Sequence, residues 1–247
     1  MRTRLLAPIF LAALVMPVSA LDLSQMTDEE RALFRSEVRA YLMENPEVIM
    51  EAVELLQNRE AEAQAQADLT LVSDNAKEIF DDGYSWVGGN PDGDITLVEF
   101  LDYRCGYCKR AHGEVAKLLE SDGNIRLIVK EFPILGEQSL LASRFAIATK
   151  QLAGADSYKA MNDALMALRG DVTLPALRRL SSTFGLDADA IEAHMQSDEV
   201  AAEIAQTRAL AQRLRISGTP TFVMQDEMLR GYMPYDQMKA LIAEKRG

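Results

Sequence analysis

The sequence predicts an α/β domain that carries a helical insertion and follows a separate helical N-terminal region. Two apolar runs, residues 95–101 and 125–132, have the near-continuous hydrophobicity of buried strands, and the helical pattern between them suits a parallel crossover. Residues 138–213 read as helix throughout, with breaks near Gly154, Gly170, Pro175 and Gly185. Upstream, residues 27–60 repeat apolar side chains at helical spacing.

Residues 1–20 have the pattern of an export signal. Arg2 and Arg4 precede an apolar core at residues 5–16, and Val18-Ser19-Ala20 is a small-x-small cleavage site. A core of about a dozen residues is too short to span a bilayer, and no later run is long enough. We expect a periplasmic protein cleaved after Ala20, without a membrane span; an uncleaved N-terminal anchor is the alternative.

The chain is acidic, with 38 Asp and Glu against 26 Lys and Arg and a formal net charge of −12. This charge argues against nucleic acid or anionic lipid as a partner. Disulfides persist outside the cytosol, so export bears directly on the two cysteines.

Residues 21–68 are expected to form a helical oligomerisation region and arm. Thr27-Asp28-Glu29-Glu30 is a capping box, and Asn45-Pro46 separates two amphipathic helices. Residues 57–68 are Ala, Glu and Gln with almost no large side chain, which indicates an exposed arm. Short helices with rich apolar faces need a partner, so we expect a homo-oligomer through residues 27–60. Packing of these helices on the domain that follows is the alternative.

Residues 69–247 are expected to form the second domain, with its insertion at about residues 138–213. The remaining expected elements of this domain are a helix over 69–82, a first strand over 83–87, a third strand over 221–224, its hairpin partner over 228–232 and a final helix over 235–245.

Cys105 and Cys108 are the only cysteines, and they lie between a predicted strand and a predicted helix. At a helix N-terminus, Cys105 faces free backbone N–H groups and the positive end of the dipole, which favour its thiolate. Cys108, one turn on, can resolve a mixed disulfide by attacking Cys105. Redox chemistry is the leading interpretation; an inert disulfide and half of a zinc site are alternatives. Only two histidines accompany the cysteines, at no zinc-finger spacing.

A second motif, Ser217-Gly218-Thr219-Pro220-Thr221-Phe222-Val223, places a proline directly before a buried strand. Proline cannot donate to the strand ladder. A cis Thr219–Pro220 bond would leave the Thr219 backbone free to pair with a substrate chain.

Together, Cys105-Gly106-Tyr107-Cys108, the helical insertion and the motif at residues 218–222 resemble the DsbA-like thiol:disulfide oxidoreductases. The resemblance covers about residues 83–245 and implies a thioredoxin fold. Residues 34–59, with Tyr41-Leu42-Met43-Glu44-Asn45-Pro46-Glu47-Val48, are similar to the oligomerising N-terminal region of the ScsC-type (copper-sensitivity suppressor) branch.

The resemblance implies a role for each matching residue. Cys105 is the expected nucleophile, Cys108 the resolving thiol and Pro220 the adjacent cis-proline, with Thr219 before it. Glu99, six residues before Cys105, matches a buried acid that accepts the proton of Cys108 through water. A solvent-facing strand position is the alternative for Glu99.

Two further side chains are weaker candidates. Lys130 is the expected charge partner of Glu99. His112 lies seven residues after Cys105 and so shares its helical face, where packing or solvation is favoured over contact with the thiolate.

The dipeptide between the cysteines differs from the one found in the strongest oxidants of the family that this chain resembles. Those carry Pro-His, whose histidine stabilises the thiolate, whereas this chain carries Gly106-Tyr107. A less stabilised thiolate makes a milder oxidant. Thr219 is also more like the isomerase and reductase members.

The leading functional hypothesis is an exported disulfide isomerase or reductase that acts on folding proteins with cysteines, requires no cofactor and exchanges electrons with a membrane redox partner. An oligomer places several thiolates around one client. One alternative is a copper-binding protein that holds Cu(I) on Cys105 and Cys108, since soft thiolates suit that ion. A monomeric disulfide oxidase is the other.

Overall fold

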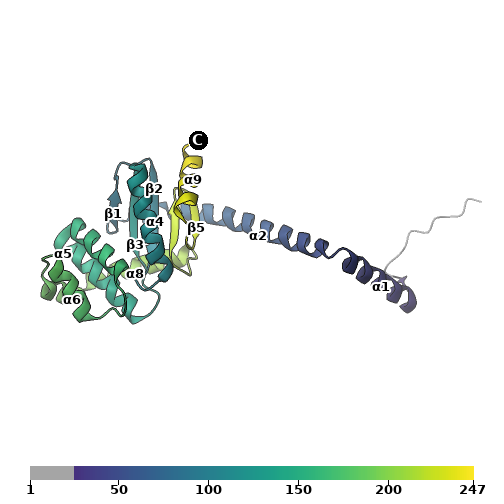
Figure 1. The fold of residues 1–247 in the computed structure, drawn as a ribbon, viewed down its shortest axis with the longest axis horizontal. Helices are drawn as coiled ribbons and strands as arrows, with labels where there is room; N and C mark the ends of the chain where they lie inside the picture. Colours follow the sequence, from purple (N-terminus) through teal and green to yellow (C-terminus); the bar gives the residue numbers. More distant parts are fainter. Residues whose placement is uncertain (1–24) are drawn as a thin grey trace, which may run out of the picture. The chain divides into compact units, whose positions relative to one another are not determined.

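The computed structural model describes residues 25–247, so the predicted signal peptide lies outside the described residues. The described chain divides into two compact units, residues 25–59 and residues 60–247. The helices (Figure 1) are α1 (Asp28–Glu44), α2 (Glu47–Asp74), α3 (Ala76–Phe80), α4 (Gly106–Asp122), α5 (Glu137–Ala167), α6 (Leu174–Thr183), α7 (Ala188–His194), α8 (Asp198–Arg213) and α9 (Tyr235–Arg246). The strands are β1 (Trp86–Gly89), β2 (Ile95–Leu101), β3 (Ile125–Glu131), β4 (Thr221–Met224) and β5 (Glu227–Arg230).

The first unit begins with the predicted capping box. Thr27 Oγ1 accepts a hydrogen bond from the Glu30 amide at 3.2 Å, and Glu30 Oε2 accepts one from the Thr27 amide at 2.8 Å. Helix α1 ends where both the amide and the side chain of Asn45 donate to the Tyr41 carbonyl, as the Asn45-Pro46 break predicts. No residue of α1 is buried. The exposed large apolar side chains of this unit are Leu33, Phe34, Val38, Tyr41, Met43, Ile49, Met50, Val53, Leu55 and Leu56.

The second unit is built on a five-stranded sheet with the strand order β1-β3-β2-β4-β5. Strands β2 and β3 are parallel, and the other pairs are antiparallel. The parallel pair is joined by α4, as the crossover pattern predicts. The α/β architecture expected from the sequence is therefore confirmed.

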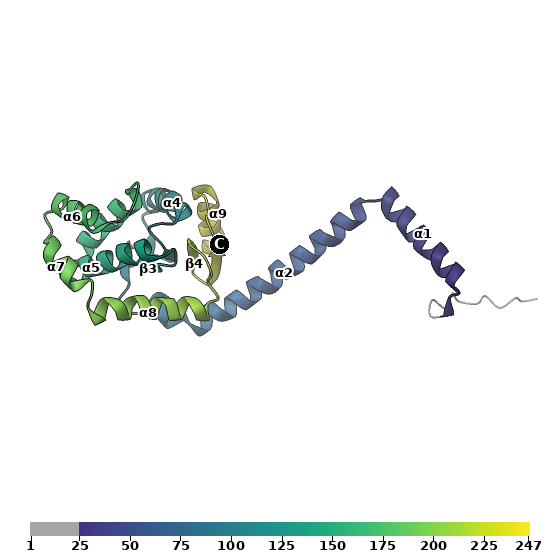
Figure 2. The same ribbon diagram turned by 90° about the horizontal axis from the view of Figure 1, so that it is seen from below.

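Different helices cover the two faces of this sheet: α4 and α9 lie on one side of it and α8 lies on the other (Figure 2). One face carries Leu97, Leu101, Leu127 and Val129 in a core that includes side chains of α4, α5 and α9. The other face carries Val98, Phe100 and Ile128 against α3 and α8. Both faces are buried, which explains why β2 and β3 read as near-continuous apolar runs.

The predicted helical insertion comprises α5 to α8. Helix α5 is interrupted at Gly154, whose φ is 86°, and Gly170 lies between α5 and α6 with a φ of 88°. These positive φ values are accessible to glycine at little cost. Pro175 lies in the first turn of α6 rather than between helices, a position where its missing N–H costs nothing.

Candidate active site

The loop that presents the cysteines is held by Asp102 at the end of β2. This fully buried carboxylate accepts hydrogen bonds from the Arg104 amide at 2.7 Å and from the Ile134 and Leu135 amides at 2.8 and 3.0 Å. It therefore ties the cysteine loop to the loop after β3. Three backbone amides donate hydrogen bonds to the Asp102 carboxyl oxygens, and these bonds offset the cost of burying that side chain.

Cys105 is the N-cap residue of α4, as the sequence predicts. Its Sγ accepts a hydrogen bond from the Cys108 amide at 3.4 Å and donates to the Thr219 carbonyl at 3.1 Å. Cys105 is 7% exposed and Cys108 is fully buried, and both are free thiols. Burial raises the pKa of the Cys108 thiol well above its ordinary value. Cys108 therefore stays protonated until a base removes its proton.

The Thr219–Pro220 bond is cis and leads directly into β4. The Pro220 carbonyl accepts a hydrogen bond from the Gly231 amide at 2.9 Å, and Thr221 Oγ1 donates to the Gly218 carbonyl at 2.9 Å. Residues 114 positions apart in sequence, Cys105 and Thr219, thus lie in contact. The structure brings together the two motifs that the sequence only suggested were neighbours.

Glu99 is 2% exposed and lies on the face of β2 whose other residues pack on α4. The solvent-facing alternative is therefore wrong. Its Oε1 atom has no hydrogen-bond partner within residues 25–247. Burial, and then the charge of Glu131, raise the pKa of Glu99 to about 8. A cavity of about 220 Å³ reaches Glu99 and is also lined by His112 and Lys159. This volume exceeds that of one water molecule several times over.

Lys130 does not pair with Glu99, so that expectation is wrong. In the β2–β3 register Glu99 lies opposite Val129 and Phe100 opposite Lys130. Because side chains alternate along a strand, Lys130 lies on the other face of the sheet from Glu99. There its Nζ contacts Asp82 Oδ2 at 2.6 Å and the Glu78 carbonyl at 2.9 Å.

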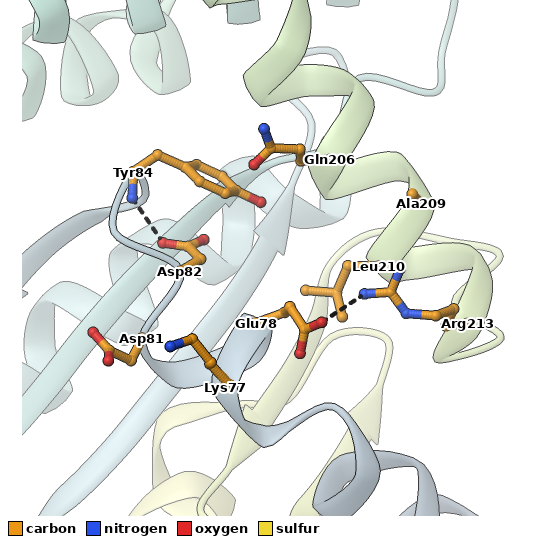
Figure 3. Close-up of a pocket in the computed structure, with 9 residues that line it drawn as sticks. All are labelled: Lys77, Glu78, Asp81, Asp82, Tyr84, Gln206, Ala209, Leu210 and Arg213. Carbon is orange, nitrogen blue, oxygen red and sulfur yellow. Dashed lines mark hydrogen bonds and ion pairs between the residues drawn. The ribbon is translucent and has the colours of Figure 1, made fainter.

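Asp82 lines a pocket of about 300 Å³ on this second face. Figure 3 shows the residues that line it, which come from α3, the loop after it and α8. The Tyr84 amide donates to Asp82 Oδ1 at 3.0 Å, and Glu78 pairs with Arg213 at 3.6 Å. None of the predicted site residues lines this pocket. The Lys130–Asp82 pair is thus part of the attachment of residues 76–85 to the sheet.

His112 is half-buried on α4, where its Nε2 contacts Asp163 Oδ1 at 2.9 Å. This contact and its place in the Glu99 cavity favour the packing interpretation. No hydrogen bond of the described residues joins His112 to either cysteine.

Sequence reasoning missed Glu131, the last residue of β3. It is 3% exposed, on the same sheet face as Glu99, and accepts hydrogen bonds from the hydroxyls of Tyr103, Tyr158 and Ser143. A signal was available: Ile125, Leu127 and Val129 define an apolar face, and Glu131 continues the same alternation.

Around the cysteines, the insertion is bound to the active-site loop. Arg104 donates to the Gly170 carbonyl at 2.7 Å, and Lys109 Nζ donates to the Leu168 carbonyl. Tyr107 is 59% exposed, and the Arg110 guanidinium lies 5.5 Å from the ring centroids of Tyr107 and Tyr232. The open side of the site therefore carries aromatic and positively charged groups.

Comparison with known proteins identifies the family of this chain. A model of the DSBA-like thioredoxin domain matches residues 96–243. The chain belongs to the DSBA-like thioredoxin family. The thioredoxin fold inferred from the resemblance is thereby confirmed, together with membership of a family of thiol:disulfide oxidoreductases. A model of the copper resistance protein ScsC N-terminal domain matches residues 30–63, as the resemblance of residues 34–59 predicted.

Two solved structures are similar to most of this chain. A thioredoxin-like oxidoreductase of Silicibacter pomeroyi is 41% identical with a TM-score of 0.66, and the match covers 70% of this chain and 98% of that one. The thiol-disulfide exchange protein alpha-DsbA2 of Wolbachia pipientis is 27% identical with a TM-score of 0.69, covering 74% of this chain and 97% of that one.

One curated relative is named as a transporter rather than as an oxidoreductase. The Na⁺/H⁺ antiporter NhaA 3 of Salinispora tropica is 29% identical over 150 residues, which are 61% of this chain and 22% of the antiporter. The chain thus spans about a fifth of the length of that relative. No helix between residues 25 and 247 combines the length and hydrophobicity needed to cross a bilayer.

Proposed function

We propose that this DSBA-like chain is an exported thiol:disulfide interchange enzyme that isomerises or reduces disulfides in folding proteins through Cys105 and Cys108. The observation that carries the proposal is the position of Cys105, which caps α4 and contacts the Thr219 carbonyl, while the charge of the buried Glu99 acts on Cys108 one turn away. This arrangement combines a thiol at a helix N-terminus, a backbone edge for a client and a buried carboxyl near the second thiol.

The chemistry divides between the two thiols. The Cys105 thiolate attacks a client disulfide, forms a mixed disulfide and releases one client thiolate. In isomerisation, another client thiolate attacks the mixed disulfide and expels Cys105 unchanged. In reduction, Cys108 attacks Cys105 instead; its proton passes to the Glu99 carboxylate, the Cys105–Cys108 bond forms and the second client thiolate leaves.

Serine variants test this division. Reactivation of scrambled ribonuclease is expected to fall to background in Cys105→Ser, because no mixed disulfide forms. Cys108→Ser, the matched control, is expected to retain isomerisation while losing net reduction of a disulfide-bonded peptide. Isomerase activity that survives in Cys105→Ser contradicts the proposal.

The proposal includes a moderate redox potential. Among the described residues, the Cys108 amide is the only hydrogen-bond donor to Cys105 Sγ, since Tyr107 is turned toward Tyr232. A thiolate without a side-chain donor is less stabilised, and the couple is correspondingly less oxidising. Equilibration with glutathione measures the potential, and a value at the strong-oxidant end of about −120 mV refutes this part.

We also propose that residues 21–68 assemble several copies of the catalytic domain, residues 69–247. The match to the ScsC N-terminal domain and the exposed apolar faces of α1 and α2 support this. An apolar groove of about 420 Å³ on this region is lined by Phe34, Arg35, Val38, Arg39, Leu42, Met43 and Ile49. A second copy of the same helices has the apolar surface to fill such a groove.

Size-exclusion chromatography with light scattering tests the assembly. The chain without residues 1–20 is expected to form an oligomer, and a chain that begins at Leu69 is expected to be monomeric. Phe34→Asp is expected to dissociate the oligomer because it places a charge in the apolar groove, whereas Gln57→Asp on the polar arm leaves it intact. Monomers throughout contradict the proposal.

A copper-handling function is the second candidate, favoured by the ScsC match. Two thiolates three residues apart suit Cu(I). Within residues 25–247, no group of three or more His, Cys, Asp or Glu is placed to hold a metal, so only the two thiols are available. Competitive titration with a Cu(I) chelator distinguishes the candidates: tight 1:1 binding without isomerase activity supports copper handling.

The location and redox partner are part of the same proposal. We expect the chain in the periplasm, cleaved after Ala20, with a membrane partner that keeps Cys105 and Cys108 in their working state. Mass spectrometry of the periplasmic fraction checks the cleavage. Thiol trapping in cells checks the redox state: a reduced pair supports isomerase or reductase activity, and an oxidised pair supports an oxidase.

A further inference from the structure

Two buried carboxyl groups share the sheet face beneath the cysteines. Glu99 on β2 lies opposite Val129, and Leu101 lies opposite Glu131 on β3. Because alternate residues share a face, Glu99 and Glu131 point to the same side and are diagonal neighbours on adjacent strands. Their residues are 2% and 3% exposed, so water screens their mutual repulsion poorly.

The hydrogen bonds of the two carboxyls differ sharply. Glu131 Oε1 accepts from the hydroxyls of Tyr103 and Tyr158, both at 2.6 Å, and its Oε2 accepts from Ser143 Oγ at 2.7 Å. Asn162 Nδ2 donates to the Tyr103 hydroxyl at 3.0 Å and orients it toward Glu131. An ionised carboxylate only accepts hydrogen bonds, so three donors favour the charged form of Glu131.

Glu99 lacks such donors. Within the described chain its Oε1 atom has no partner, and across the β2–β4 pair it faces the apolar Phe222. Its titratable neighbours are the thiol of Cys108 on α4, and His112 and Lys159 across the cavity. Burial raises the pKa of Glu131 to about 7, opposed by its hydroxyl donors, and burial with the charge of Glu131 raises that of Glu99 to about 8.

The surrounding cations are bound to other carboxylates. His112 and Lys159 both contact Asp163. Lys150, whose charge favours ionised Glu131, contacts Glu203. No ion pair of residues 25–247 includes Glu99 or Glu131. The repulsion between the two carboxyls is therefore not offset by a directly bound positive charge.

We propose that Glu131 is a positioning residue for disulfide exchange: its charge, held by three hydroxyl donors on the adjacent strand, opposes the negative charge of ionised Glu99. The ionised Glu99 is then a stronger base toward Cys108. The second part rests on the proposed role of Glu99 as the acceptor of the Cys108 proton.

The first test is direct titration of both carboxyls by ¹³C NMR of the reduced, full-length chain. In the wild-type protein, Glu131 is expected to ionise at a lower pH than Glu99. In Glu131→Gln, the midpoint of Glu99 is expected to fall by about one pH unit, a tenfold change in its acid dissociation constant. A Glu99 midpoint that does not move overturns the proposal, as does a wild-type protein in which Glu99 ionises first.

The control is Glu114→Gln. Glu114 accepts hydrogen bonds from Tyr232 and the Tyr235 amide and is absent from the groups that influence Glu99. Its loss is expected to leave the Glu99 midpoint unchanged. If Glu131→Gln does not fold, the wild-type order of ionisation still decides the proposal.

A kinetic readout separates this proposal from the proposed function. The rate of peptide-disulfide reduction in a single turnover is measured against pH in wild type, Glu131→Gln and Glu99→Gln. The acid limb is expected to move about one pH unit lower in Glu131→Gln and to disappear in Glu99→Gln. A moved NMR midpoint with an unmoved limb supports the coupling of the two carboxyls and refutes the role of Glu99 in the proposed function.

Discussion

The N-terminal helices and the sheet of the catalytic domain use the same kinds of apolar side chain in opposite ways. Phe34 on α1 is 44% exposed, whereas Phe100 on β2 is fully buried. Helix α1 buries none of its residues, while β2 buries all but one. Residue type therefore does not determine burial: Phe100 packs against neighbours within its own chain, whereas Phe34 stays exposed. The proposed oligomer gives the two regions different roles, with stability from the sheet domain and association from the helices.

The largest expected effect is on the free energy of unfolding, and it differs between substitutions of Phe100 and of Phe34. Phe100→Ala leaves a cavity beside Phe132, whose ring centroid lies 6.1 Å away, and is expected to lower the free energy of unfolding by about 4 kcal/mol. Phe34→Ala is the matched change and is expected to leave unfolding of the catalytic domain unchanged. Urea unfolding monitored at Trp86 measures both. Equal losses from the two variants would remove the distinction between the regions.

A smaller effect is expected at the polar pair on the second face of the sheet. Burial alone raises the pKa of Asp82, but the charge and hydrogen bond of Lys130 outweigh it and hold that pKa below its ordinary value. Asp82→Asn leaves the Lys130 charge buried without its counter-charge and is expected to cost about 3 kcal/mol of unfolding free energy. Asp94→Asn breaks an exposed pair with Arg246 and is expected to leave the urea midpoint unchanged. Similar midpoints in both variants contradict this expectation.

The next prediction concerns how the free energy of unfolding of the sheet domain depends on pH. The pKa of Glu99 is raised from 4.5 to about 8, so the folded chain holds a proton that the unfolded chain releases between these values. The free energy of unfolding is therefore expected to fall as pH rises through that window, by at most about 1.4 kcal/mol per pH unit from this group. Urea unfolding of the reduced protein from pH 5 to pH 8 measures the slope. Glu99→Gln is expected to reduce the slope and leave the part that comes from Glu131, whose pKa is raised to about 7; an unchanged slope argues that Glu99 is already ionised.

The smallest expected effect lies in the N-terminal helices. Thr27→Ala removes one half of the capping box and is expected to destabilise the first turn of α1 by about 1 kcal/mol. Hydrogen exchange of the α1 amides is expected to accelerate about fivefold, while protection in β2 and β3 stays constant. Thr27→Ser retains a capping hydroxyl and is the control. Faster exchange in the sheet as well would show that the two regions unfold together.

Local sequence signals predicted most elements. The run at residues 95–101 matches β2, residues 221–224 match β4, and the Thr27 capping box begins α1 where expected. The cysteine motif was predictable for the same reason, since Cys105 and Cys108 lie one helical turn apart. The cis bond before Pro220 was anticipated from the motif around it, which links it to the cysteines in this family.

Side-chain partners across the sheet were not predictable. Lys130 was assigned to Glu99, but a register in which Val129 lies opposite Glu99 sends Lys130 to the other face, toward Asp82. The alternation along β3 could have placed Glu131 on the apolar face, but its three hydroxyl donors come from separate segments of the chain and were not predictable. The meeting of such groups depends on strand pairing and helix packing, which no local pattern encodes.

The sequence by itself determined the chemistry of this protein and the order of its elements, because turns, caps, apolar periodicity and the cysteine spacing are short-range properties. Only the tertiary structure decided which charges face one another. Side chains alternate along β3, so Lys130 lies on the opposite sheet face from Glu99, whereas Glu131, one residue further on, lies on the same face as Glu99. The two carboxyls are buried, where water screens charges poorly, so this one-residue alternation decides which charges act on Glu99.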